Sequence, residues 1–235
     1  MRMKAPRVPP AAVAAGATVI GPRVLPGVYT VKMTRGTETF TTKLDVQLDR
    51  RATYTVADRK LELAAAMRVY ALLGDLSFDV DRINGVHDAL LERAAKLGAN
   101  DPLRKQCVDE AAKVDEIRKK IVATKEGGAV TGEERIREKT ASVYGAVVFD
   151  EGRPPDYYVA RIDSLAHERK DVVDEFETWA AKNLKATNTS LAAKKLEAIQ
   201  PITRAAWDKA NAESDGGGSS GGGGRLRMSD ALGWR

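Results

Sequence analysis

The longest periodic stretch of the chain lies in residues 56–97, which read VADRKLELAAAMRVYALLGDLSFDVDRINGVHDALLERAAKL. Apolar residues recur in it at intervals of three and four, the spacing that places side chains on one face of an α-helix. The stripe consists of Leu61, Ala65, Leu72, Leu76, Ile83, Val86, Leu90, Ala94 and Leu97. The pattern predicts one helix of about 40 residues, roughly 60 Å long, in a fold that is mainly α.

Start and stop signals divide the following residues into further helices. Asp101 and Pro102 are a typical N-cap and first-turn pair, and they open a second helix that we expect to stop at Gly127. Thr131 and Glu134 have the spacing of a capping box, which predicts the start of a third helix. We expect each of these two helices to contain about 22 residues.

A fourth helix is expected near Asp156, because the consecutive prolines at 154 and 155 break the preceding helical pattern. Its stripe comprises Ile162, Leu165, Arg169, Val172, Phe176, Trp179 and Leu184, with weaker helical character to about Ala193. Two long and two short helices predict an antiparallel bundle in which the short pair folds back on the distal half of the first helix.

This bundle topology makes specific neighbours of distant segments. Residues 97–102 should lie near residues 152–158, at the far end of the first helix. Residues 182–193 should return toward residues 56–63, where that helix begins.

The N-terminal region has a period of two instead. Residues 21–51 contain a hairpin turn at Arg35-Gly36, flanked by two alternating runs. The apolar positions are Val28, Tyr29, Val31, Met33, Phe40, Leu44, Val46 and Leu48. This pattern is typical of a β-hairpin like the last two strands of an Ig-like sandwich. An isolated two-stranded ribbon is marginal in water, so we expect it to pair with strands outside this chain or to lie on the helices.

The domain organisation follows from these changes of period. Residues 1–51 form a partial Ig-like β segment led by a loop, residues 52–199 a helical bundle, and residues 200–235 a tail with a Gly/Ser linker, which we expect to be disordered.

Composition excludes several classes of protein. The 38 basic and 33 acidic residues give a net charge of only +5 and are interleaved, so we expect no nucleic-acid binding. No apolar run is long enough to span a membrane. Prolines interrupt residues 1–20, which therefore make no convincing signal peptide.

Side chains that could carry chemistry are sparse. His87 and His167 have no ligand set at metal-binding spacing, and Cys107 lies at an apolar helical position. Asp79 and Asp81 resemble a calcium loop only weakly, and an i,i+3 pair of Asp79 with Arg82 explains them better. We expect no catalytic residue, no cofactor and no metal.

Four segments resemble the C-terminal region of large bacterial sortilin-like β-propeller proteins, which carry neuraminidase repeats and are often labelled glycosyl hydrolases. They are RMKAP at 2–6, GPRVLPGVYTV at 21–31, LDRR at 48–51 and NGVHDAL at 84–90. The resemblance covers about residues 1–207 and implies an exported parent, hence a periplasmic or extracellular location. The family's propeller has no counterpart here, so no catalytic residue is carried over, and the chain looks like a C-terminal fragment.

Two functions are consistent with these observations. The first is a non-catalytic structural or interaction module, whose partner is its own N-terminal propeller, another protein, or a second copy bound through the hairpin. The second is an accessory part of a glycan-processing hydrolase whose catalytic residues lie in the missing propeller. The candidate interaction surface for either is Asp150, Glu151, Arg153, Tyr157 and Tyr158.

Overall fold

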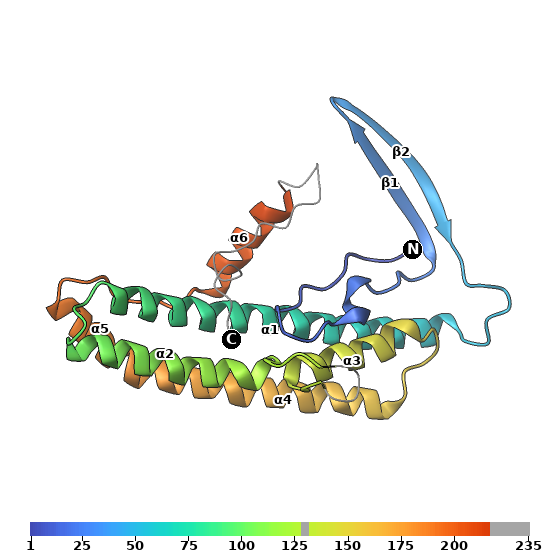
Figure 1. Ribbon diagram of the computed structural model, residues 1–235. Coiled ribbons are helices and arrows are strands. Elements are labelled where there is room, and N and C mark those ends of the chain that lie inside the picture. Colours follow the sequence, from blue (N-terminus) through green and yellow to red (C-terminus); the bar gives the residue numbers. More distant parts are fainter. Residues whose placement is uncertain (128–131, 217–235) are drawn as a thin grey trace. The chain divides into compact units, whose positions relative to one another are not determined.

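The computed structural model describes residues 1–127 and 132–216. The chain divides into two units, Met1–Pro201 and Ile202–Arg235, and each is described by itself. The elements of the first unit are η1 (Gly16–Val19), β1 (Gly27–Arg35), β2 (Glu38–Val46), α1 (Val56–Ala95), α2 (Pro102–Ile121), α3 (Ile136–Phe149), α4 (Asp156–Trp179), the π-helix η2 (Ala180–Leu184) and α5 (Lys185–Ala193). A mainly helical unit with a two-stranded antiparallel hairpin confirms the coarse prediction of a mainly α chain with a small β part (Figure 1).

Helix α1 has the predicted length of 40 residues. Its start is capped reciprocally, because the Asp58 amide donates to the Thr55 hydroxyl (3.2 Å) and the Thr55 amide donates to the Asp58 carboxylate (2.9 Å). One predicted member of its stripe is wrong. Leu61 is 47% exposed, whereas its neighbour Glu62 is buried, so the buried face at the start of α1 contains a charged side chain where the period placed a leucine.

The second and third helices are shorter than predicted. Asp101 caps α2 as expected, accepting a hydrogen bond from the Leu103 amide (2.9 Å), but α2 ends after 20 residues at Ile121. Helix α3 has only 14 residues. Its first turn is held by Glu138, which accepts the Arg135 amide (3.1 Å). Glu134 therefore does not form the predicted capping box, and Thr131 lies outside the described residues.

The direction of α3 overturns the predicted topology. Helices α2 and α3 follow one another along α1 in the direction opposite to it, and α4 then runs the same way as α1 (Figure 1). Lys194 pairs with Asp101 (2.8 Å) at the distal end. Residues 182–193 therefore lie beside residues 97–102, and residues 152–158 lie near the start of α1, the reverse of the prediction.

Helix lengths explain this arrangement. At 1.5 Å per residue, α2 and α3 measure roughly 30 and 21 Å, so that together they cover most of the roughly 60 Å of α1. Buried Val122 and Ala123 continue the contact between them. A chain that turned back after α2 would leave the proximal half of the α1 stripe in water.

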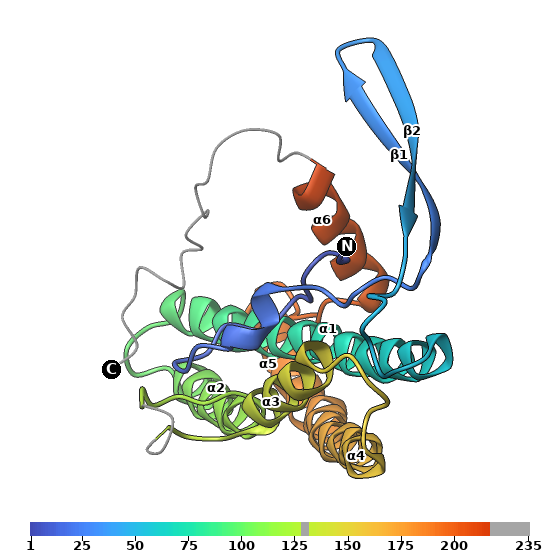
Figure 2. The same cartoon turned by 90° about the vertical axis from the view of Figure 1, so that its right-hand side faces the viewer.

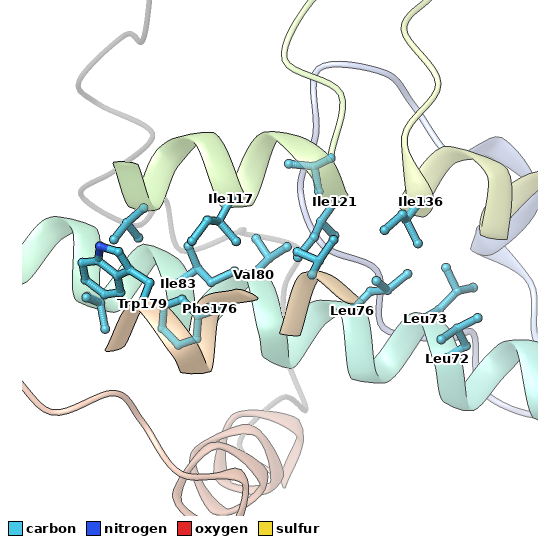
Figure 3. Packing of buried hydrophobic residues seen from close by; sticks show 14 of the residues in the cluster. Leu72, Leu73, Leu76, Val80, Ile83, Ile117, Ile121, Ile136, Phe176 and Trp179 are labelled. Carbon is cyan, nitrogen blue, oxygen red and sulfur yellow. The ribbon is translucent and has the colours of Figure 1, made fainter. Parts of the chain in front are cut away.

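The core is a continuous apolar seam between these helices. Figure 3 shows Leu72, Leu73, Leu76, Val80 and Ile83 of α1 meeting Ile117 and Ile121 of α2, Ile136 of α3, and Phe176 and Trp179 of α4. Ion pairs border the seam, and they differ from the expected i,i+3 pair. Asp79 binds Arg169 of α4 (2.6 Å), while Arg82 pairs with Glu177.

The π-helix lies where two side chains reach one buried carboxylate. The indole of Trp179 donates to Glu110 of α2 (2.8 Å), and the Asn183 amide donates to the same carboxylate (3.1 Å). A π turn contains one more residue than an α turn at the same site. The wider turn brings both donors onto Glu110, and the helical run then continues through α5.

The second unit contains α6 (Arg204–Gly216), within the tail for which we predict disorder. Arg204 pairs with Asp208 (2.9 Å) one turn along and lies 5.3 Å from the Trp207 ring. This part of the tail is helical. The Gly/Ser tract beyond Gly216 lies outside the described residues.

The corrected stripe of α1 gives a direct test. Leu76 is fully buried, so Leu76→Ala should lower the free energy of unfolding by about 2–5 kcal/mol, because it removes buried methyl groups and leaves a cavity. Leu61→Ala, the same change at an exposed position of the same helix, should alter it by less than about 0.5 kcal/mol. Urea denaturation of both variants measures the difference, and equal losses would contradict the packing described.

Candidate functional site

Residues 150–158 form the loop predicted as an interaction surface. Some of its side chains bind other parts of the chain, and others are exposed. Asp150 accepts the backbone amides of Glu151 (2.7 Å) and Gly152 (3.2 Å), so it shapes its own turn. Arg153 lies 3.8 Å from Asp156 at the surface. Of the two tyrosines, Tyr157 is 63% exposed, while Tyr158 packs partly on the core. The centroids of their two rings are 4.2 Å apart.

Glu151 belongs to a junction between the N-terminal segment and the bundle. Its carboxylate pairs with Arg23, just before β1, and accepts a hydrogen bond from the Tyr54 hydroxyl, just before α1. Burial, followed by the nearby charge of Arg2, lowers the pKa of Arg23. The ion pair and the hydrogen bond therefore connect the segments before and after the hairpin to the loop that precedes α4.

A buried ion pair lies beside this junction. Arg59 donates to Glu62 (2.5 Å), and the two side chains are only 4% and 1% exposed. The second carboxylate oxygen of Glu62 has no hydrogen-bond partner among the described residues. Burial raises the pKa of Glu62 although Arg59 and Arg23 oppose the shift. A hollow of about 260 Å³ adjoins the pair, lined by Arg23, Tyr54, Arg59, Glu151 and the hairpin ends.

The residues before β1 form an irregular strap that is fixed to the helices. Tyr144 donates its hydroxyl to the Ile20 carbonyl (2.7 Å), and Arg137 donates to the Val13 carbonyl (2.5 Å). At Gly21 a Cβ would lie 2.0 Å from the Met3 carbonyl oxygen, so only glycine fits where the strap crosses itself. The loop that we predicted ahead of the strands is thus packed on α3, and it holds the base of the hairpin.

The hairpin itself has two chemically different faces. The register pairs Tyr29 with Leu44, Val31 with Thr42 and Met33 with Phe40. Since directly opposed residues share a face, these side chains form one face, which is apolar apart from Thr42 and the Arg35–Glu38 pair at the tip. The other face carries Thr30 with Lys43, Lys32 with Thr41, and Thr34 with Thr39.

Both faces of the hairpin lie in water. Met33 is 58% and Phe40 47% exposed, and nearly every strand residue is exposed. Figures 1 and 2 show the two strands standing clear of the helices of the same unit. The expectation that the hairpin lies on the helices is therefore wrong, and its apolar face is exposed.

The described residues offer little for catalysis. They contain no group of three or more His, Cys, Asp or Glu side chains that could hold a metal ion. His87 is mostly buried next to Asp88, and His167 contacts the Asp163 carbonyl on its own helix. Cys107 is fully buried, and burial raises the pKa of its thiol. Within the described part of the chain, no helix is both long and apolar enough to cross a membrane.

Comparison with known proteins identifies no relative. No family model matches the chain, and neither a curated protein nor a solved structure is detectably similar to it.

Sequence reasoning missed the ion network at the base of the hairpin. Glu62 interrupts an apolar stripe, and nothing in its neighbourhood marks it as buried. Arg23 and Glu151 are far apart in sequence, so their pairing has no local signal. The two faces of the hairpin were visible in the alternation, but their exposure was not.

The buried pair predicts an asymmetry between single and double substitutions. Arg59→Met should destabilise the fold by about 3–5 kcal/mol, because it leaves the Glu62 charge buried without its partner. Adding Glu62→Leu should restore much of that loss. Lys170→Met, which breaks the exposed pair with Asp174, serves as the control and should leave stability nearly unchanged.

The same variants predict a pH dependence. The pKa of Glu62 in the folded chain lies above its unfolded value, so the folded state takes up the proton first on acidification. The stability of the Arg59→Met variant should therefore rise as the pH falls through that folded pKa. Denaturation at several pH values measures it, and the double variant should lack this rise.

Proposed function

We propose that the chain is a non-catalytic interaction module from the C-terminal region of an exported sortilin-like β-propeller protein, and that its hairpin is the binding element. The bundle acts as the rigid support, and the strap and the Arg23–Glu151 pair hold the base of the hairpin. In this proposal the hairpin supplies two strands of an Ig-like sandwich that a protein partner completes.

The observation that carries the proposal is the separation of the two hairpin faces. One is mostly apolar and the other is mostly Thr and Lys, as expected when one face packs and the other meets water. Burying an apolar side chain of this size contributes about 1.5–3 kcal/mol. Met33, Phe40 and Leu44 obtain only part of this within the chain, because about half of each residue remains exposed.

The accessory role in glycan hydrolysis receives less support. It requires the carboxylates of the 150–158 loop to face a ligand, yet Asp150 accepts two backbone amides and Glu151 binds Arg23 and Tyr54. Asp156 is exposed but lies 3.8 Å from Arg153, and of the two tyrosines only Tyr157 is largely exposed. A single exposed tyrosine is more consistent with a surface contact than with an acid and base pair.

The non-catalytic role is tested by activity. The purified chain should show no turnover of aryl glycosides or sialosides. Turnover that is lost in both Asp150→Asn and Tyr157→Phe would contradict the proposal and support the hydrolase role. Background that survives both substitutions would indicate contamination.

Removal of the hairpin tests whether it serves binding or folding. Residues 28–45 can be replaced by a short Gly/Ser link, because Gly27 and Val46 are cross-strand partners. The deletion should leave the thermal midpoint of the bundle nearly unchanged, since these residues bury little surface. Tyr144→Phe, which removes a strap hydrogen bond, should lower stability by about 0.5–1.5 kcal/mol. A large loss on deleting the hairpin would show that it belongs to the fold.

A further inference from the structure

We propose that the apolar face of the hairpin pairs with the same face of a second copy of this chain. The apolar face consists of Tyr29, Val31, Met33, Phe40, Leu44 and Val46. This inference rests on the proposed function, because it names the partner of the same surface. The two hairpins are proposed to associate through their apolar faces and not through their strand edges. Experiment can distinguish these two modes of association.

The face is self-complementary about a two-fold axis parallel to the strands. Such an axis lays β1 of one copy over β2 of the other, since both copies present the same patch. The register pairs Met33 with Phe40, and Arg35 with Glu38 at the tip. In the dimer, Met33 of one copy then faces Phe40 of the other, so that a thioether lies on an aromatic ring. In the same way, Arg35 of one copy faces Glu38 of the other.

Charge also favours the face over the edges. Lys32 and Lys43 lie mid-strand on the other face, so face-to-face pairing leaves both in water. Edge pairing would instead add a strand beside these lysines, which are residues that discourage such contacts. It would also leave both apolar faces exposed, whereas the burial of apolar surface drives most protein association.

The size of the face sets the strength of the pairing. Nine residues at about 3.3 Å and two strands about 4.8 Å apart give a face of roughly 30 by 10 Å. Its area of roughly 300 Å² is well below the roughly 800 Å² per partner of a stable interface. The second copy is therefore bound reversibly, and the dimer should accumulate only as concentration rises.

Sedimentation velocity of the full chain across a dilution series measures this equilibrium. The average mass should rise with concentration toward that of a dimer. Phe40→Lys should keep the chain monomeric throughout the series, because it places a charge within the apolar contact. Thr39→Lys is the matched control, since it adds the same charge one residue away, on the opposite face and opposite Thr34, and it should behave like the unchanged chain.

Cross-linking tests the geometry independently. Cys107 is fully buried, so one introduced cysteine provides the only accessible thiol in the described chain. Thr42→Cys lies on the apolar face and Thr41→Cys on the other. Packed sheets lie about 10 Å apart, within reach of a short bis-maleimide, which should couple the Thr42→Cys chain into dimers and leave the Thr41→Cys chain monomeric.

The outcomes separate this inference from the function on which it rests. A monomeric unchanged chain at every concentration, with no Thr42→Cys dimer, overturns the pairing of copies but leaves a different protein as partner. Loss of association in Thr39→Lys as well as Phe40→Lys overturns face pairing in favour of an edge. If circular dichroism shows that Phe40→Lys disturbs the fold, the comparison of Thr42→Cys with Thr41→Cys decides. The proposed function is contradicted by different results, namely turnover of glycosides or a large loss of bundle stability when the hairpin is deleted.

Discussion

The length of α1 is the constraint on which the rest of the first unit depends. Its apolar stripe runs for most of 40 residues, and a helix of ordinary length covers only part of it. The chain covers it with α2 and α3 placed one after the other, and then with α4, η2 and α5 running alongside in the direction of α1. The return pass through α2 and α3 brings the loop before α4 back to the start of α1, where the base of the hairpin also lies.

Buried charge at that end complements the apolar seam. An apolar stripe is tolerant of small shifts along or around a helix, because one aliphatic side chain substitutes readily for another. The buried Arg59–Glu62 pair tolerates no such shift, because a displaced partner leaves a buried charge without compensation. The half-exposed Arg23–Glu151 pair adds a second contact at the same end. We therefore assign them a role in fixing where the hairpin leaves the bundle, rather than a large net contribution to stability.

Local features of the fold were predictable from sequence, and non-local ones were not. The length of α1, the Asp101 cap and the two alternating strands of the hairpin follow from period, cap and turn chemistry, which act over a few residues. The hairpin turn itself lies one residue later than predicted, at residues 36–37. The direction of α3 depends instead on contacts such as Ala123 with Glu138 and with Ala12, which no periodicity encodes. The candidate site divided in the same way, since Tyr157 is exposed as a surface residue should be, whereas Glu151 is held by Arg23, more than a hundred residues away.

The exposed apolar face of the hairpin is a conflict between sequence and surroundings, because the alternating apolar residues predict a buried face and the structure leaves that face in water. It does not arise from a shortage of polar residues, because the outer surfaces of the helices carry cross-helix pairs such as Lys120–Glu175 and Arg68–Asp163. It is also not a general failure of patterning, since the opposite face of the same two strands is Thr- and Lys-rich. A sequence that keeps one face apolar while solubilising the surfaces around it is inconsistent with the isolated unit and consistent with a covered one. That contrast on a single pair of strands is why we propose the hairpin, rather than the tyrosine-bearing loop, as the binding element.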